Sequence, residues 1–214
     1  MKRKIGNFFI LAASVLACQA TPITSLVNTG VGAAGNGLVD PNWEVRQGAA
    51  PFVSAYRTTS PGFPFGSWMA NSLTSMWVSP RSSYPGSGSD AGGLWEFRTE
   101  FDLTGFLLST VTIQFRVATD NRFDGYRVNG GPVVIPGAHA SFTAFSPWYT
   151  VNPSGLLGGA NTLTILVYNV PQATGNPAGL RVELNAQGTE VPEPSTAAMM
   201  GLALAGWAVF RWRR

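Results

Sequence analysis

The chain is poor in the residues from which most reactive and metal-binding sites are built. Its 214 residues include one cysteine, Cys18, and one histidine, His139. A single cysteine cannot form an intrachain disulfide, and one histidine without further thiols argues against a zinc site. No Gly-x-Ser-x-Gly sequence offers His139 a nucleophile. These absences predict a protein that is not an enzyme, with no metal site and no cofactor.

Charge is also scarce between the two ends of the chain. Only 12% of the residues are charged, and lysine occurs only at Lys2 and Lys4. Three of the 14 basic residues lie at the N-terminus and three at the C-terminus; the other eight are arginines, against ten acidic residues once Glu193 is assigned to the tail. The net charge of the middle of the chain is therefore near −2, although the net charge of the whole chain is +3. Nucleic-acid binding needs a basic face on the folded domain, so none is predicted.

The N-terminus has the pattern of a secretory signal peptide. Lys2, Arg3 and Lys4 precede a short apolar run at 5–17. Residues 1–20 are therefore predicted to be removed by signal peptidase after Ala20, taking Cys18 with them. The competing interpretation is a lipoprotein box that ends in an acylated Cys18, which the bulky Leu16 disfavours. Both interpretations predict export.

The C-terminus combines a short proline motif, an apolar run and a basic end. The motif is Val191, Pro192, Glu193 and Pro194, and the apolar run covers 196–210 before Arg211, Arg213 and Arg214. Proline ends helices and is excluded from central strands, so the motif should be extended and open to a peptidase. The apolar run is barely long enough to cross a bilayer as one hydrophobic helix, with the arginines on the cytoplasmic side.

These C-terminal residues resemble the PEP-CTERM sorting signal of exported bacterial proteins. The resemblance covers about 190–214 of the predicted tail, 188–214, and implies recognition by exosortase, a membrane-embedded peptidase. It also implies an inner-membrane intermediate, removal of the tail, and delivery to the cell surface or the exopolysaccharide matrix. The alternative is a plain C-terminal membrane anchor whose prolines only end a linker.

Between the two ends, 39–187 is predicted to form one all-β domain, with 21–38 as a linker or an edge strand. Alternating apolar and polar residues predict strands at 95–103, 111–117, 163–167 and 180–184. Further strands are expected at 43–47, 68–78, 126–128, 133–135 and 142–149. No stretch of helix length repeats its apolar residues every 3.6 positions. Short strands and many turns favour an antiparallel two-sheet jelly-roll sandwich over an up-and-down barrel.

Two segments resemble galactose-binding-like jelly-roll domains. The first, 118–130, places acidic and Asn residues before a hairpin that ends in Asn129-Gly130, a pair that tolerates positive φ. The second, 159–163, has the pattern Gly-x-Asn-x-Leu at the entry to a late strand. The resemblance implies that fold, in which many members bind carbohydrate at one end of the sandwich, some hold a structural calcium and others are purely structural. Fold alone does not decide among them.

A saccharide site needs aromatic rings for stacking and planar polar groups for the hydroxyls. The candidate residues are Trp68, Tyr84, Trp148, Arg81, Asp120, Asn121, Arg122 and Asp124. The alternatives are that the tryptophans belong to the core, as is expected of Trp77 and Trp95, and that Asp and Asn cap turns. Arg122 and Gly131 stand where a helix-loop-helix calcium loop needs ligands, so that kind of site is excluded. A structural calcium of another kind stays open.

The sequence thus predicts a non-enzymatic exported protein of the cell surface or matrix that associates with exopolysaccharide. One alternative is a purely structural surface protein that binds no glycan. A weaker one is a carbohydrate-active enzyme that uses Asp120, Asp124 and His139.

Overall fold

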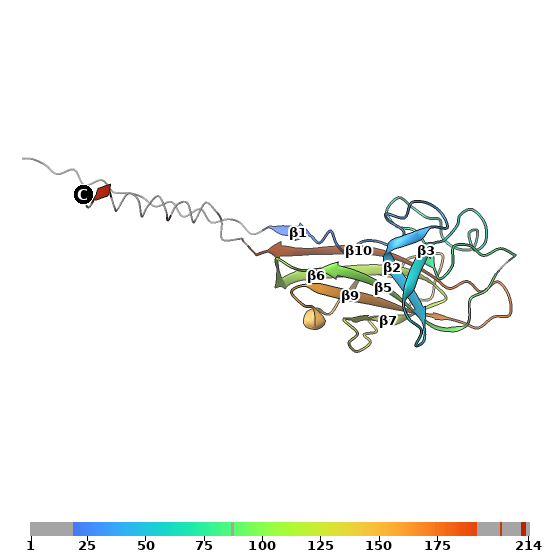
Figure 1. Cartoon of the computed structure of the whole chain (residues 1–214). Helices are drawn as coiled ribbons and strands as arrows, with labels where there is room; N and C mark the ends of the chain where they lie inside the picture. The colour runs from blue at the N-terminus through green and yellow to red at the C-terminus, as the bar shows by residue number, and fades with distance from the viewer. Residues whose placement is uncertain (1–18, 87, 192–201, 203–210, 213–214) are drawn as a thin grey trace, which may run out of the picture.

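The computed structural model describes residues 19–86, 88–191, 202 and 211–212 (Figure 1). The predicted signal peptide up to residue 18 and nearly all of the predicted C-terminal helix lie outside the described residues. So do Pro192, Glu193, Pro194, Arg213 and Arg214 of the sorting motif. Within the described ranges, no helix is both long enough and apolar enough to cross a membrane.

Apart from one 3-10 turn, the elements of the described part are antiparallel strands joined by loops, so the predicted all-β class is confirmed. The elements are β1 (Ala20–Pro22), β2 (Val39–Gln47), β3 (Val53–Arg57), β4 (Val78–Ser79), β5 (Gly93–Asp102), β6 (Phe106–Asp120), β7 (Arg122–Val128), β8 (Tyr149–Thr150), the 3-10 turn η1 (Pro153–Gly155), β9 (Ala160–Asn169) and β10 (Gly179–Glu190). The longest ladders are β10 with β6 and β5 with β9.

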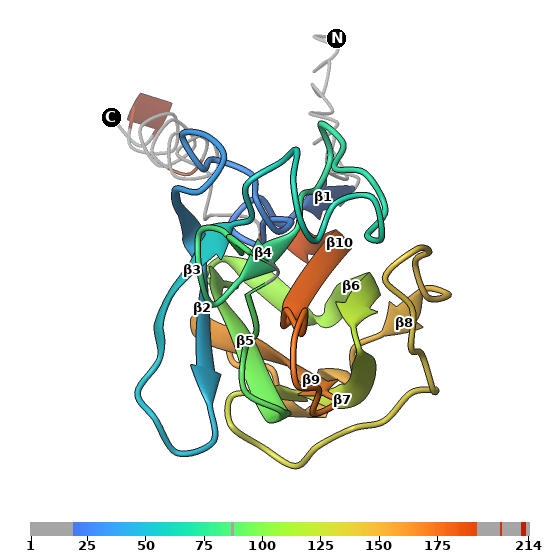
Figure 2. The same ribbon diagram turned by 90° about the vertical axis from the view of Figure 1, so that its right-hand side faces the viewer.

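The strands form one continuous curled sheet, whereas two separate sheets were expected. Its order is β7-β9-β5-β2-β3-β4-β10-β6-β8, with β1 added to β10. Strands β3 and β4 join the two arms, because Tyr56 of β3 pairs with Val39 of β2 and with Ser79 of β4. The arm β7-β9-β5-β2 therefore curls round to face the arm β10-β6-β8 (Figure 2).

The core fills the space inside the curl. One cluster of buried side chains takes members from both arms, among them Phe97 of β5, Ile165 of β9 and Val182 of β10. Phe115 of β6 is fully buried in this core, and the centroids of three other aromatic rings lie 5.2–6.0 Å from the centroid of the Phe115 ring. The side chains that alternate with these on the strands face outward, which is the pattern read from the sequence.

The four strands with the clearest alternation are confirmed, as part of β5, β6, β9 and β10. The shorter predictions at 43–47 and 126–128 fall inside β2 and β7. The hairpin turn is also confirmed, since Asn129 and Gly130 have φ of 50° and 68°.

Three predicted strands are wrong for most of their length. Of 68–78 only the last residue is in a strand, 133–135 makes a single bridge from Val134 to Tyr126, and 142–149 contributes only Tyr149 to β8. The segments 68–78 and 142–149 carry apolar side chains because several of these side chains pack on the outside of the sheet. Trp68 and Trp77 stack at 4.2 Å in a second cluster with the outward-facing Ala118, and Phe142 lies against that cluster.

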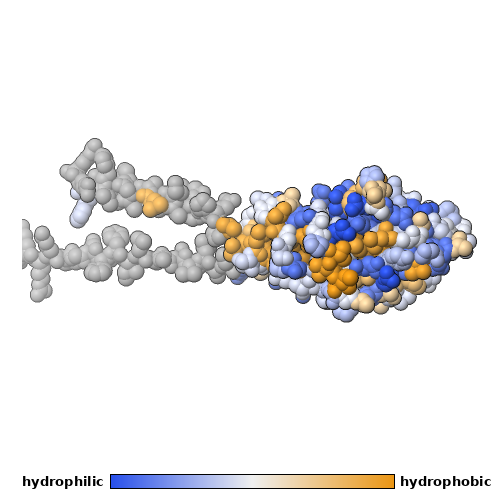
Figure 3. All heavy atoms as spheres, turned by 90° about the horizontal axis from the view of Figure 1, so that it is seen from below, coloured by the Kyte–Doolittle hydropathy of each residue, from blue (hydrophilic) through white to orange (hydrophobic). Residues whose placement is uncertain are grey.

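The edge of the sheet at β7 is covered by the segment that follows it. Phe123 and Tyr126 form isolated bridges to His139 and Val134, and this leaves Val133 and Ile135 exposed. Figure 3 views the molecule from below, the side on which β7 lies in Figure 1, and shows apolar patches among polar ones there. A covered edge offers few free backbone groups to another chain.

Candidate functional site

A hollow of about 180 Å³ lies at the end of the sheet where β6 stops and β10 starts. Aromatic and planar polar side chains share its lining: Phe63, Trp68, Phe142, Asp120, Asn121, Gln172 and Asn176. We refer to it as the Trp68–Asp120 pocket. It brings together three of the residues predicted to bind a saccharide, which come from two segments 52 residues apart in the chain.

The pocket forms where the loop before β4 crosses the first residue of β10. Asp120 is the last residue of β6 and lies opposite Gly179. A Cβ at Gly179 would come within 2.2 Å of the Trp68 ring, so only glycine lets the indole lie over the strand here. The indole Nε1 then donates a hydrogen bond of 2.8 Å to Oδ2 of Asp120.

Asp120 supplies the carboxyl group of the pocket lining, and its pKa is shifted. It is 6% exposed, and its Oδ1 accepts a hydrogen bond of 2.6 Å from Nδ2 of Asn121. Burial raises the pKa of Asp120 to about 6, against the opposing effect of the bonds from Trp68 and Asn121. Each carboxylate oxygen has a second lone pair, so the group can still accept hydrogen bonds from a hydroxyl.

The raised pKa of Asp120 predicts a pH-dependent stability with a definite sign. A carboxyl with a higher pKa in the folded chain than the 3.8 of the free group binds more protons when folded. Its contribution is therefore complete at low pH and is lost as the pH rises through about 6. Asp120→Asn does not titrate, so between pH 4 and 7 the variant should gain about 2–3 kcal/mol relative to the parent. Urea unfolding of both proteins at several pH values measures this, and a constant difference would contradict it.

Asn176 and Gln172 were not predicted to belong to the site. Both lie in the loop between β9 and β10, whose Pro, Gly and Asn residues signal only a turn. Asn176 is buried, and its Oδ1 accepts no hydrogen bond from the residues that the structure describes. An unsatisfied buried acceptor is costly, so Asn176 is an unusual polar residue in the pocket wall that the sequence did not single out.

Tyr84 and Arg81 do not face the pocket, although both were candidates. The Tyr84 ring is buried, and its hydroxyl donates to Oδ2 of Asp90 at 2.5 Å, while Arg81 Nε donates to Oδ1 at 2.7 Å. Asp90 also accepts from the backbone N–H of Ala178 and donates its own N–H to the carbonyl of Asn176. Tyr84 and Arg81 thus support the loop that lines the pocket, and do so through Asp90.

The other candidates also lie outside the pocket lining. Arg122 and Asp124 pair with each other at 2.5 Å, and the Arg122 guanidinium lies over the Tyr168 ring. Trp148 is 44% exposed, with the Arg116 guanidinium 5.0 Å from its ring centroid. Trp148 is therefore a separate exposed ring and not a wall of the same site.

The predicted alternatives of calcium and catalysis receive no support from these contacts. In the described part of the chain, no three His, Cys, Asp or Glu side chains come together in a way that could hold a metal ion. Asp120 bonds to Trp68, Asp124 pairs with Arg122, and Nε2 of His139 contacts the carbonyl of Ala144. The three residues proposed for an enzyme therefore have separate partners.

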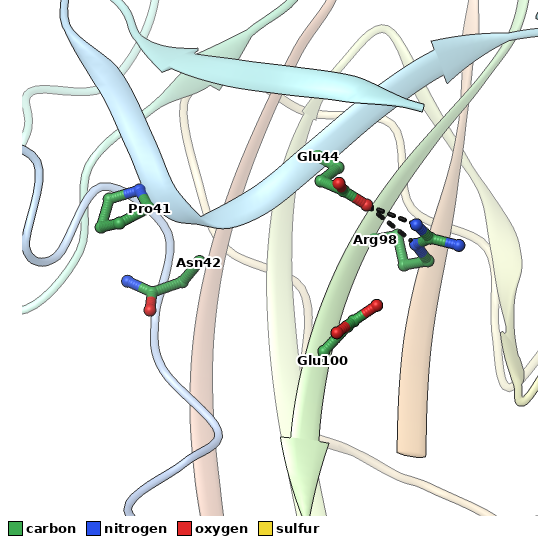
Figure 4. Close-up of a pocket in the computed structure, with 5 residues that line it drawn as sticks. All are labelled: Pro41, Asn42, Glu44, Arg98 and Glu100. Atoms are coloured by element: carbon green, nitrogen blue, oxygen red, sulfur yellow. Dashed lines mark hydrogen bonds and ion pairs between the residues drawn. The ribbon is translucent and has the colours of Figure 1, made fainter. Parts of the chain in front are cut away.

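A second hollow lies on the outer face of β2 and β5 (Figure 4). It is lined by Pro41, Asn42, Glu44, Arg98 and Glu100, and Arg98 donates to Glu44 across the two strands. The lining contains no aromatic ring. It therefore lacks the stacking surface that a sugar ring needs, and the Trp68–Asp120 pocket is the better candidate.

Comparison with known proteins identifies the tail of the chain. Residues 190–214 match the family described as the PEP-CTERM protein-sorting motif. No curated protein and no solved structure is significantly similar to the chain. The motif marks an exported protein that passes through the membrane before exosortase processes it, so the predicted sorting signal is confirmed.

Proposed function

We propose that this protein is a non-enzymatic component of the cell surface or extracellular matrix that binds a saccharide unit of exopolysaccharide in the Trp68–Asp120 pocket. The observation that carries the proposal is the convergence in one hollow of Phe142, a partly exposed ring that packs beside the buried Trp68, with the planar polar groups of Asp120, Asn121 and Asn176. Stacking on rings and hydrogen bonds to planar groups are the two interactions that a pyranose offers.

The position of the pocket also supports this function. It lies where β6 ends and β10 begins, while the sorting tail follows the opposite end of β10. Carbohydrate sites at one end of the sandwich are what the likeness to galactose-binding-like jelly rolls implies, and we propose that this curled sheet is a variant of that fold.

Retention on exopolysaccharide tests the binding claim. We expect the purified protein to be retained on the polysaccharide of its own host, and Asn121→Ala combined with Gln172→Ala to reduce retention at least tenfold. Both side chains line the pocket and are at least partly exposed. Because Asn121 also bonds to Asp120 and to the N–H of Val170, urea unfolding of the double variant is compared with the parent, and Gln172→Ala alone should already reduce retention. Affinity electrophoresis measures the retention.

Trp148→Ala supplies the matched comparison, because Trp148 is exposed but lies outside the pocket. Its retention should equal that of the parent. If Trp148→Ala alone abolished retention, the saccharide would bind at the Trp148 ring and not in the pocket. No retention of the parent on any matrix polymer would favour the purely structural alternative.

The sorting motif is tested separately. Glu193→Ala should leave the precursor in the inner membrane, because the motif then lacks the acidic residue that exosortase recognises. Immunoblotting of membrane and released fractions measures this, and Glu190→Ala, an acidic residue three positions earlier, is the matched control. Normal release of Glu193→Ala would argue for a plain anchor.

A further inference from the structure

A larger hollow adjoins the Trp68–Asp120 pocket at the ring of Phe63. Phe63 belongs to the lining of both. The larger hollow has a volume of about 440 Å³, and its lining also includes Thr59, Ser83 and Tyr84. We refer to it as the Phe63–Tyr84 hollow. The two hollows therefore share one aromatic wall.

Phe63 is held between the two hollows by a turn and by a neighbouring ring. The N–H of Phe65 donates to the carbonyl of Gly62 at 2.7 Å, which closes a turn around Phe63. The Phe63 ring meets the buried Tyr84 ring edge on, with the planes at 82° and the centroids 6.3 Å apart. Phe63 is itself partly exposed, so it has a fixed position and still offers apolar surface to a ligand.

The segment that carries Ser83 is fastened to the segment that carries Phe63. The N–H and Oγ1 of Thr59 both donate to the carbonyl of Ser82, at 3.0 and 2.7 Å. The Tyr84 hydroxyl points away to Asp90, so the side that lines the hollow is the aromatic ring. A lining that is already fixed needs little ordering when a ligand binds.

The volumes indicate that the Trp68–Asp120 pocket is only part of a binding site. Typical ligand sites enclose roughly 300–1,000 Å³, whereas this pocket has about 180 Å³. A polymer with one sugar unit in the pocket has to continue out of it. The Phe63 side provides the space, together with apolar ring surface and the hydroxyls of Thr59 and Ser83, which are the groups that a second sugar unit needs.

The charges of the lining favour a ligand without acidic groups. Among the described residues that line the two hollows, Asp120 is the only charged side chain. Arg81 and Arg122 are paired with Asp90 and Asp124 instead. Carboxylate and sulfate groups are recognised mostly by arginine and lysine, and an anion placed beside an ionised Asp120 is repelled. A chain of uronic acids therefore fits this lining poorly.

We propose that the ligand is a stretch of uncharged polysaccharide at least two sugar units long, with one unit in the Trp68–Asp120 pocket and the next in the Phe63–Tyr84 hollow. This rests on the saccharide binding proposed above and names the class of saccharide. The Phe63 ring contacts the chain where it passes from one hollow to the other, and the hydroxyls of Thr59 and Ser83 receive the second unit.

Competition by fragments of the host exopolysaccharide tests the length and the charge of the ligand. Mild acid hydrolysis gives fragments that are separated by length and by charge, and each competes at neutral pH with retention of the purified protein on the intact polymer. We expect uncharged fragments of two to four units to compete about tenfold more strongly than the monosaccharide, because they occupy both hollows. Fragments of equal length that carry uronic acids should compete about tenfold more weakly than the uncharged ones.

Each part of the inference has an outcome that overturns it. Equal competition by monosaccharide and tetrasaccharide would remove the second sugar unit. Acidic fragments that compete as well as uncharged ones would remove the preference for an uncharged chain. No retention of the parent on the polymer would instead overturn saccharide binding itself. These measurements use the parent protein, so they do not depend on the folding of a variant.

Ser83→Tyr places a bulky side chain in the Phe63–Tyr84 hollow and leaves the lining of the other pocket unchanged. Ser83 is exposed, so the fold should tolerate the change. We expect competition by the tetrasaccharide to weaken about tenfold and competition by the monosaccharide to stay the same, so that the dependence on length is lost. Ser109→Tyr is the matched control, because Ser109 is an exposed serine near the start of β6, outside both linings. An unchanged dependence on length in Ser83→Tyr would overturn the second sugar unit.

Discussion

Replacing Phe115 by alanine is expected to lower the free energy of unfolding by about 3–5 kcal/mol. The ring is fully buried, and it contacts Phe123 and Tyr126 of β7 as well as Tyr149 of β8. It thus connects the two arms of the curl at the centre of the core. A loss of this size is a large share of the stability of an ordinary domain, so a substantial unfolded fraction is expected at 37 °C.

Two further variants show whether the loss arises from the cavity. Phe115→Leu keeps most of the volume and should cost less than about 1.5 kcal/mol. Leu73→Ala removes an apolar side chain that is almost fully exposed and should change stability by less than about 0.5 kcal/mol. Urea unfolding measures all three. If Phe115→Ala cost no more than Leu73→Ala, the two arms would not share the core described above.

The strands that the sequence predicted are those with one buried face. Along most of β5 and β6 apolar core positions alternate with polar ones, so two-residue periodicity is sufficient to find these strands. Strand β3 was missed because only Ala55 among its five residues is buried. Such a short connecting strand depends on the curl of the whole sheet, which no local pattern encodes.

The false strands have a physical explanation of their own. Trp68, Trp77 and Phe142 are apolar because they cover the outside of the sheet, and a covering loop can bury aromatic rings without alternation. Glu96 shows the reverse error. The alternation in 95–103 places Glu96 on the polar face of the strand, where exposure to solvent is expected, yet it is buried and pairs with Arg46 and Arg127. Burial of one strand face was predictable, whereas the burial added by neighbouring strands and loops was not.

The candidate site was also only partly predictable from the sequence. Asp120 and Asn121 were identified because acidic and amide residues at a turn are informative in the sequence. Their proximity to Trp68 depends on Gly179, where the missing Cβ makes room for the indole. The sequence near Gly179 does not predict that contact, because a glycine before a strand is most simply interpreted as a turn residue.

Asp90→Ala is expected to lower the free energy of unfolding by about 3 kcal/mol, since it removes one carboxylate that serves three donors. The buried N–H of Ala178 would be left without an acceptor, and the buried Tyr84 hydroxyl would keep only the carbonyl of Ala178, at 3.2 Å. Burial, together with the charge of Asp90, raises the pKa of Tyr84 well above its usual range, so the phenol stays a donor throughout the physiological pH range. Arg81 would lose its ion pair as well.

Arg81→Ala is the control, because the Arg81 side chain is 46% exposed and such an ion pair contributes about 0–1 kcal/mol. The Asp90 carboxylate also accepts from the N–H of Ala178, two residues after Asn176, and so fastens the end of the loop that lines the pocket. The loss of its side chain should loosen the loop that lines the pocket, so retention on polysaccharide should fall together with thermal stability. Equal losses of stability for Asp90→Ala and Arg81→Ala would mean that the ion pair, and not the buried donors, gives Asp90 its importance. Reduced stability with unchanged retention would place the saccharide away from the loop that contains Gln172 and Asn176.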